Sequence, residues 1–143
     1  MSHHEALRIV AEVFDPVFIR LGLRRIGFDY NEISFGNITA TYESSRLRLR
    51  VIRDRSIWEV RVGADEEPLE LILQFLGQPY LAESQDLPRN VESNFEKLAE
   101  LFSPANYSTF RKEFDDFTRA RSLRRQNIGS VFEETPKVRP PAD

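Results

Sequence analysis

The chain has 143 residues and a mass of 16.7 kDa, which suits one domain with a modest core. It contains no cysteine, so disulfides, thiolate metal sites and cysteine nucleophiles are excluded. Its net charge of -3 argues against non-specific nucleic-acid binding as the main role.

The N-terminal segment predicts a helix. Ser2 followed by Glu5 matches the S-x-x-E capping box that starts helices. Pro16 interrupts the apolar stripe that follows, so either the helix kinks there or Asp15 caps a second helix with Pro16 at its first position. Gly22 is a typical helix stop. The stripe itself is formed by residues at helical spacing: Leu7, Val10, Phe14, Val17 and Leu21.

After this helix, the apolar period changes from about 3.6 to 2, which indicates β-strands. Gly36-Asn37 is a two-residue hairpin signal that places strands at 31–35 and 38–42; a continuous strand with a bulge at Gly36 is the alternative. Two more strands follow at 47–52 and 57–62, joined by a loop at 53–56. The sequence therefore predicts a four-stranded antiparallel meander.

Strict alternation gives this meander one apolar and one charged face. The expected register sets Val51 opposite Trp58 and Arg50 opposite Glu59. Among the aromatic residues near the sheet, only Tyr30 is expected on the outer face. The expected inward-facing side chains are Ile33, Phe35, Ile38, Ala40, Tyr42, Leu47, Leu49, Val51, Trp58, Val60 and Val62.

Three helices are expected after the sheet. The first runs from Pro68 to Leu76, the second opens at Pro88, and the last starts at Ser103-Pro104. Residues 126–143 are polar and proline-bearing, which is typical of a flexible tail. The predicted fold is a single α+β domain over residues 1–125, with the order one helix, four strands, three helices and the helices packed on one face of the sheet.

The middle of the chain is its most acidic part. Residues 63–102 hold nine acidic and two basic residues, which gives -7. Three of the acidic residues recur at a spacing of four on one helix face, where like charges are mildly unfavourable. A basic neighbour such as the arginines at 119–125, or a basic partner, would compensate. The predicted partner-binding residues are Glu83, Asp86, Glu92, Glu96 and Glu100.

An arginine row on the outer sheet face gives an alternative site. It could bind an anionic ligand such as phosphate or nucleic acid, or it could be a solvated face paired with neighbouring glutamates. Stacking platforms for RNA need exposed aromatic residues on adjacent strands, and the sheet aromatics are expected to be buried, so nucleic acid is unfavoured. The predicted anion-binding residues are Arg46, Arg48, Arg50 and Arg61.

The sequence contains no recognisable catalytic, cofactor or metal motif. His3 and His4 are adjacent near the N-terminus, so they do not face one another on a helix, and the body of the domain has no histidine for acid–base catalysis. We expect no cofactor and no enzyme activity; an enzyme that uses only carboxylates and arginine is the remaining alternative. No apolar run approaches the roughly 18 residues of a membrane helix, and the N-terminus lacks a secretory signal, so we expect a cytoplasmic protein without a membrane partner.

Several short strings resemble a group of small uncharacterised bacterial α+β proteins. These proteins have an L-G-[FL] helix end, an F-G-N segment and an acidic D-R-[GS] turn, and residues 20–76 carry the likeness. Some of these proteins are similar in architecture to immunity proteins of bacterial toxin systems, but the likeness transfers no functional residue. The matching strings are Leu21-Gly22-Leu23, Ser34-Phe35-Gly36-Asn37, Tyr42-Glu43-Ser44, Leu47-Arg48-Leu49-Arg50 and Asp54-Arg55-Ser56, with Ser56 where glycine is commoner.

The functional expectation follows from the acidic middle and the missing catalytic set. We expect a non-enzymatic cytoplasmic module that binds a basic protein partner, as an inhibitor of a toxin would. The meander also leaves two exposed strand edges, so two copies of the chain could pair through an edge strand to form a homodimer.

Overall fold

The computed structural model describes residues 1–33 and 36–137, with side chains described as far as residue 125. The chain divides into two compact units, Met1–Tyr107 and Ser108–Asp143. The first unit contains an antiparallel sheet in the order β1-β2-β3-β4-β5, which confirms the predicted α+β class but adds a fifth strand. The strands are β1 (Arg24–Asn31), β2 (Asn37–Glu43), β3 (Arg48–Asp54), β4 (Ile57–Val62) and β5 (Glu67–Pro68).

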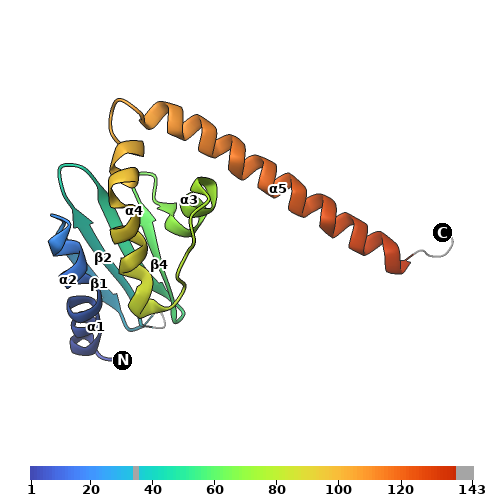
Figure 1. Cartoon of the computed structure of the whole chain (residues 1–143). Coiled ribbons are helices and arrows are strands. Elements are labelled where there is room, and N and C mark those ends of the chain that lie inside the picture. The colour runs from blue at the N-terminus through green and yellow to red at the C-terminus, as the bar shows by residue number, and fades with distance from the viewer. Residues whose placement is uncertain (34–35, 138–143) are drawn as a thin grey trace. The chain divides into compact units, whose positions relative to one another are not determined.

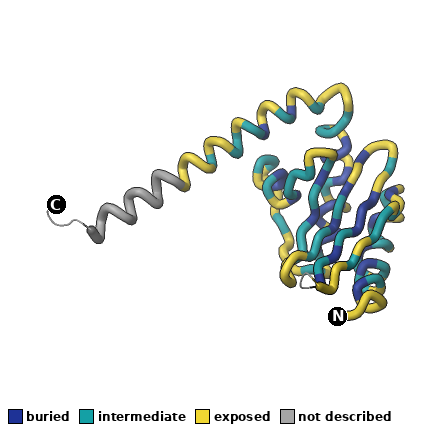
Figure 2. The backbone as a smooth tube through the Cα atoms, turned by 180° about the vertical axis from the view of Figure 1, so that it is seen from behind, coloured by how far each residue is buried: buried dark blue, intermediate teal, exposed yellow. Residues whose placement is uncertain are grey.

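The helices of the first unit gather on one face of this sheet. Helices α1, α2 and α4 lie on that face in Figure 1, and the view from behind in Figure 2 shows the strands of the opposite face with none of the three in front. Helix α3 packs against β4 and β5. The helical segments are α1 (His3–Ile9), the π-helical turn η1 (Val10–Phe14), α2 (Asp15–Arg20), α3 (Leu69–Leu76), the short 3-10 helix η2 (Ser84–Asp86) and α4 (Leu87–Leu101).

The N-terminal helix begins at the predicted capping box, and a second helix, α2, begins at Asp15. The Ser2 hydroxyl accepts a hydrogen bond from the Glu5 backbone N–H at 3.1 Å, and the Ser2 N–H donates to the Glu5 carboxylate at 3.0 Å. Pro16 lies in the first turn of α2, directly after the π-helical turn, because proline has no N–H to continue the ladder. Of the two predicted alternatives, the second helix with Pro16 in its first turn is the one observed, but its expected cap is wrong, because no side chain caps α2 and the Asp15 carboxylate accepts from Tyr42 instead.

The first hairpin differs from the prediction. Strand β1 begins at Arg24, and its pairing of Tyr30 with Ile38 brings Tyr30 to the inner face, so the outer placement of Tyr30 is wrong. Ile33 lies in the connecting loop with 93% of its surface exposed, so its expected burial is also wrong. Phe35 lies outside the described residues. A bulge between Arg25 and Gly27 breaks the alternation of β1, which hides this strand in the sequence.

The second hairpin has a shorter turn than predicted. Arg55 and Ser56 form a two-residue turn with φ of 52° and 70°, in place of the expected four-residue loop. Val51 therefore faces Val60 rather than Trp58. A register shift of two residues keeps every side chain on its predicted face. Trp58 accordingly stays on the inner face, where its ring lies 5.5 Å from the Phe14 ring.

The core lies between the sheet and the helices. Phe18 packs edge-on against Tyr42 with ring centroids 4.7 Å apart, and both side chains are fully buried. The inward-facing residues of β2, β3 and β4 confirm the predicted apolar face. The buried members of the predicted set are Ile38, Ala40, Tyr42, Leu47, Leu49, Val51, Val60 and Val62.

A polar network connects the helices to the sheet. The Tyr42 hydroxyl donates to Asp15 Oδ1 at 2.5 Å, and the Arg25 guanidinium donates to the same carboxylate from Nε at 3.1 Å and from Nη2 at 3.2 Å. Burial and the hydrogen bond to Asp15 raise the pKa of Tyr42, so its hydroxyl stays protonated. These bonds link the start of α2 to β1 and β2.

Two further contacts fix the connections around α4. The buried Asn90 side chain accepts from the Leu81 N–H and donates to the Leu81 carbonyl, both at 2.9 Å, which holds the segment before η2 against α4. Gly63, at the start of the β4–β5 turn, has φ of 81° and lies close to the Phe102 ring. The Tyr107 hydroxyl donates to the Asp65 carboxylate of the same turn.

The last helix, α5 (Tyr107–Lys137), carries the second unit. It begins after a turn at residues 103–106, three residues later than the predicted Pro104. Three phenylalanine side chains of α5 form a stack, with ring centroids 5.3 Å apart for Phe110 and Phe114 and 6.5 Å apart for Phe114 and Phe117. The helix continues past residue 125, where we expected it to end. Residues 138–143 of the predicted tail lie outside the described residues.

The Gly63→Ala substitution tests the packing of the β4–β5 turn. A Cβ on Gly63 would lie 2.5 Å from a Phe102 ring carbon, whereas one on Gly22 would meet nothing within 4 Å, although Gly22 also has a positive φ of 85°. We expect Gly22→Ala to lower the free energy of unfolding by about 1–2 kcal/mol through backbone strain alone. Gly63→Ala should cost about 2–5 kcal/mol, because overpacking adds to that strain. Urea unfolding measures both, and equal costs would contradict the close packing of Phe102 on Gly63.

Candidate functional site

A groove lies between the β2–β3 connection and the C-terminal end of α4. Its volume is about 800 Å³, and its lining includes the apolar side chains of Ala99 and Phe102, which we call its apolar floor. A second hollow of about 550 Å³ shares Ser45, Arg46 and Phe102 with it and extends to the β4–β5 turn. We call these two hollows together the end groove, because both lie where the turns of the sheet meet the end of α4.

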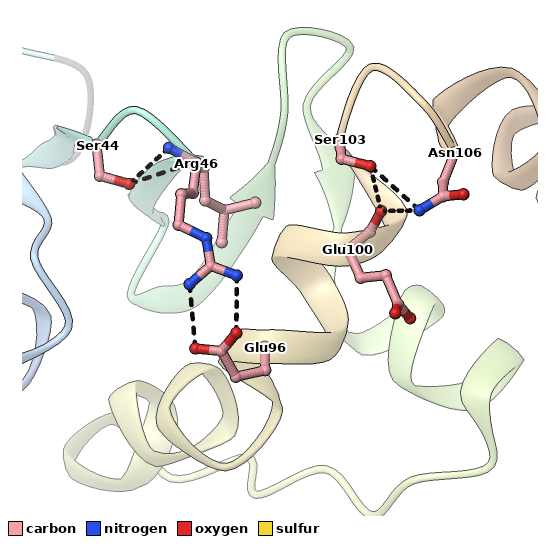
Figure 3. Close-up of polar contacts among 7 residues, drawn as sticks. Ser44, Arg46, Glu96, Glu100, Ser103 and Asn106 are labelled. Carbon is pink, nitrogen blue, oxygen red and sulfur yellow. Dashed lines mark hydrogen bonds and ion pairs between the residues drawn. The ribbon is translucent and has the colours of Figure 1, made fainter.

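Arg46 projects into the end groove from the β2–β3 connection. Its guanidinium donates to Glu96 from Nη2 at 2.7 Å and from Nη1 at 3.1 Å, as Figure 3 shows. The same guanidinium lies 5.5 Å from the centroid of the Phe95 ring. The Ser44 hydroxyl accepts from the N–H groups of Arg46 and Leu47, at 3.1 and 3.2 Å. The turn at Ser44, the Phe95 ring and the Glu96 carboxylate together hold Arg46 in one orientation.

The opposite wall of the groove is the end of α4. The Glu100 carbonyl accepts from the Ser103 hydroxyl at 2.8 Å and from the Asn106 side-chain amide at 3.0 Å (Figure 3). The Ser103 N–H also donates to this carbonyl, at 3.2 Å, so these side-chain bonds add to the backbone bonds that close the end of α4. The Glu100 carboxylate pairs with Lys97 at 3.1 Å.

The predicted acidic residues of α4 do share one exposed face. Side-chain exposure is 42% for Glu92, 79% for Glu96 and 61% for Glu100. Glu92 pairs with Arg20 of α2 at 3.1 Å, so the cations that compensate this face include Arg20 and Arg46, which sequence reasoning did not identify. We call Glu92, Glu96 and Glu100 the α4 ridge.

The other two predicted partner-binding residues lie at the opposite end of α4 from the end groove. Glu83 is exposed directly before η2, and Asp86 is the last residue of η2. The Asp86 carboxylate lies 3.7 Å from the guanidinium of Arg89. The structure therefore brings Glu96 and Glu100 together in the end groove but does not bring Glu83 and Asp86 there.

The predicted arginine row is also paired with carboxylates. Arg46 is not part of a row on the outer face of the sheet, because its side chain binds Glu96 in the end groove. The expected Arg50–Glu59 pair is wrong, because the shorter turn moves Arg61 opposite Arg50. The three remaining arginines each have a carboxylate partner: Arg48 with Glu43 at 3.3 Å, Arg50 with Glu66 at 2.8 Å and Arg61 with Glu59 at 2.9 Å. The outer face thus carries alternating signs rather than uniform positive charge.

The described residues that line the end groove supply hydroxyls, charged side chains and apolar side chains. His3 lies in α1, where its ring packs edge-on against Phe28 and Tyr30. Among the residues that the structure describes, no three histidine, aspartate or glutamate side chains gather as they would around a metal ion. The described helices also include none with the length and apolar character needed to cross a membrane. Hydroxyls, ion pairs and an apolar floor are suited to contact with another molecule's side chains.

Comparisons with protein-family models, curated proteins and solved structures found no significant match to this chain. The function proposed below is therefore based on the geometry of the end groove and the α4 ridge.

The titration of Glu96 tests the Arg46 contact. The hydrogen bonds from Arg46 hold the pKa of Glu96 below its ordinary value of 4.5. Because this pKa is lowered in the folded state, any stabilisation from the pair is present above pH 4.5 and is lost as the pH falls through the lowered pKa. Carboxyl-carbon NMR should show the Glu96 pKa rising toward 4.5 in Arg46→Gln. The Arg48→Gln control should leave it unchanged, and an equal shift in both variants would contradict the specific pair.

Proposed function

We propose that this chain is a non-enzymatic protein-binding module that uses the α4 ridge and the end groove to bind a basic protein partner. The observation that carries the proposal is the placement of Glu96 and Glu100, which are exposed one helical turn apart beside a groove with an apolar floor. A lysine or arginine from a partner could place its charge against these carboxylates and its aliphatic stem over Ala99 and Phe102.

The internal ion pairs support this surface rather than block it. Exposed ion pairs contribute about 0–1 kcal/mol, so a partner's cation can share or replace them at little cost. Glu96 remains 79% exposed although it binds Arg46, and a carboxylate can accept several hydrogen bonds at once. Arg20 and Arg46 also hold their carboxylates in fixed orientations, which reduces the entropy lost on binding.

The concrete role that we propose is inhibition of a basic protein in the cytoplasm, as immunity proteins inhibit toxins. Its support is the resemblance of residues 20–76 to small bacterial α+β proteins, some of which are similar in architecture to immunity proteins, together with the carboxylates of α4. Opposite charges would speed the encounter of the two proteins and make their affinity fall with added salt.

Charge reversal on α4 tests this function. Tagged wild-type protein and a variant that carries Glu92→Lys, Glu96→Lys and Glu100→Lys would capture partners from native lysate, with quantitative mass spectrometry as the measurement. We expect a basic protein that the wild type retains at low salt, loses at high salt, and that the triple variant fails to retain. Circular dichroism checks that the variant folds, since all three side chains are exposed.

Glu32→Lys is a control for charge reversal at a single site away from α4, because Glu32 is also exposed but lies in the β1–β2 connection. It should capture the same basic protein as the wild type. A partner set that stays unchanged in the triple variant would remove the proposal.

A further inference from the structure

We propose that Arg50 and Arg61 form a phosphate-binding site on the outer face of the sheet, and that the Glu66 carboxylate now stands where the phosphate would bind. Arg50, Arg61 and Glu66 do not belong to the α4 ridge and do not line the end groove, although the β4–β5 turn that carries Glu66 also borders that groove. The proposed site contains only two of the four arginines of the predicted row, because Arg46 and Arg48 are not part of it.

The sheet register places the two arginines side by side. Arg50 of β3 and Arg61 of β4 are direct cross-strand partners, so their side chains leave the same face of the sheet next to one another. Like charges at directly opposite positions repel each other, and an anion between them removes that repulsion. The pairing itself therefore favours a negatively charged group at this position.

Each arginine also keeps a donor without a partner. The Nε atoms of Arg50 and Arg61 are both buried, and neither has a hydrogen-bond partner. Arg50 binds Glu66 through Nη1, and Arg61 binds Glu59 through Nη2. A buried donor that lacks a partner is unfavourable. An oxyanion that accepts from Nε and a neighbouring Nη would use the planar edge with which arginine binds phosphate.

Glu66 has the properties of a group that an external anion can displace. Its carboxylate is partly exposed and reaches Arg50 at 2.8 Å from the β4–β5 turn. Its backbone has φ of 53°, in the left-handed region that non-glycine residues seldom adopt, and its N–H donates to the Gly63 carbonyl at 3.1 Å. The carboxylate thus sits on a short turn at the edge of the site, where it can move without disturbing the sheet.

The number of donors favours phosphate over a carboxylate ligand. Two guanidinium groups present more N–H donors than the two oxygens of a carboxylate can use, whereas a phosphate group offers three or more acceptor oxygens. Thr41, the direct cross-strand partner of Arg50, supplies a hydroxyl on the same side. Glu59 remains on Arg61 and keeps the affinity modest.

Phosphate titration with three variants tests the site. Isothermal titration of the full chain with inorganic phosphate, at ionic strength held constant with potassium chloride, should show saturable binding. Arg50→Lys keeps the charge but removes the planar edge, so we expect about a tenfold or greater loss of affinity. Arg48→Lys, on the same strand and face, is the control and should leave the affinity unchanged. Glu66→Gln should bind phosphate more tightly, because its competing charge is gone.

The outcomes separate the proposal from simpler explanations. Adenosine monophosphate in place of inorganic phosphate shows whether a nucleotide or a free phosphate is the preferred source of the group, and saturable binding of either supports the site. Absence of saturable binding by wild type and Glu66→Gln overturns it. Equal losses in Arg48→Lys and Arg50→Lys would indicate diffuse attraction and also overturn it. None of these variants alters the α4 ridge, so a negative result in the phosphate titration does not affect the interpretation of the capture experiment.

Discussion

The Asp15 carboxylate accepts hydrogen bonds from Tyr42 and Arg25 where the helices meet the sheet, and the placement of the candidate site depends on this contact. The π-helical turn and Pro16 place Asp15 at the start of α2, facing the strands. Helix α2 then packs against α4, and Arg20 of α2 binds Glu92 of the α4 ridge. A polar contact inside the fold thereby fixes the orientation of an acidic surface outside it.

Charge on this protein is organised in pairs. Arg46, Arg48, Arg50 and Arg61 all bind carboxylates of the same chain, and so do the cations that face the α4 ridge. Exposed pairs of this kind contribute little to stability but hold long side chains in defined orientations. A partner or a ligand therefore meets ordered charges that it can share or exchange. In the end groove the ordered charges lie beside an apolar floor, whereas on the outer face they surround two unpartnered Nε donors.

The sequence predicts the inner face of the sheet well because alternation survives errors of register. The turn at Arg55 and Ser56 has positive φ at two residues that are not glycine, so its two-residue length could not be recognised, yet the resulting shift of two residues left each side chain on its face. Strand β1 was missed because its bulge at Ile26 interrupts the alternation, and β5 because it has only two residues. The α4 ridge follows from helical spacing alone. Other features depend on contacts between residues distant in sequence and could not be predicted. They are the pairing of Arg20 with Glu92, the pairing of Glu66 with Arg50, and the place of Phe102 in the lining of the end groove.

A double-mutant cycle on Asp15 and Tyr42 tests this account most directly. Tyr42→Phe removes the buried hydroxyl, Asp15→Asn removes the charge that it binds, and urea unfolding gives the free energy of each variant. Because the hydrogen bond involves an ionised acceptor, we expect Tyr42→Phe alone to cost about 1–3 kcal/mol, and to cost at least about 1 kcal/mol less when it is made in the Asp15→Asn variant. Costs that add within about 0.5 kcal/mol would contradict a direct contact between the helices and the sheet at this point.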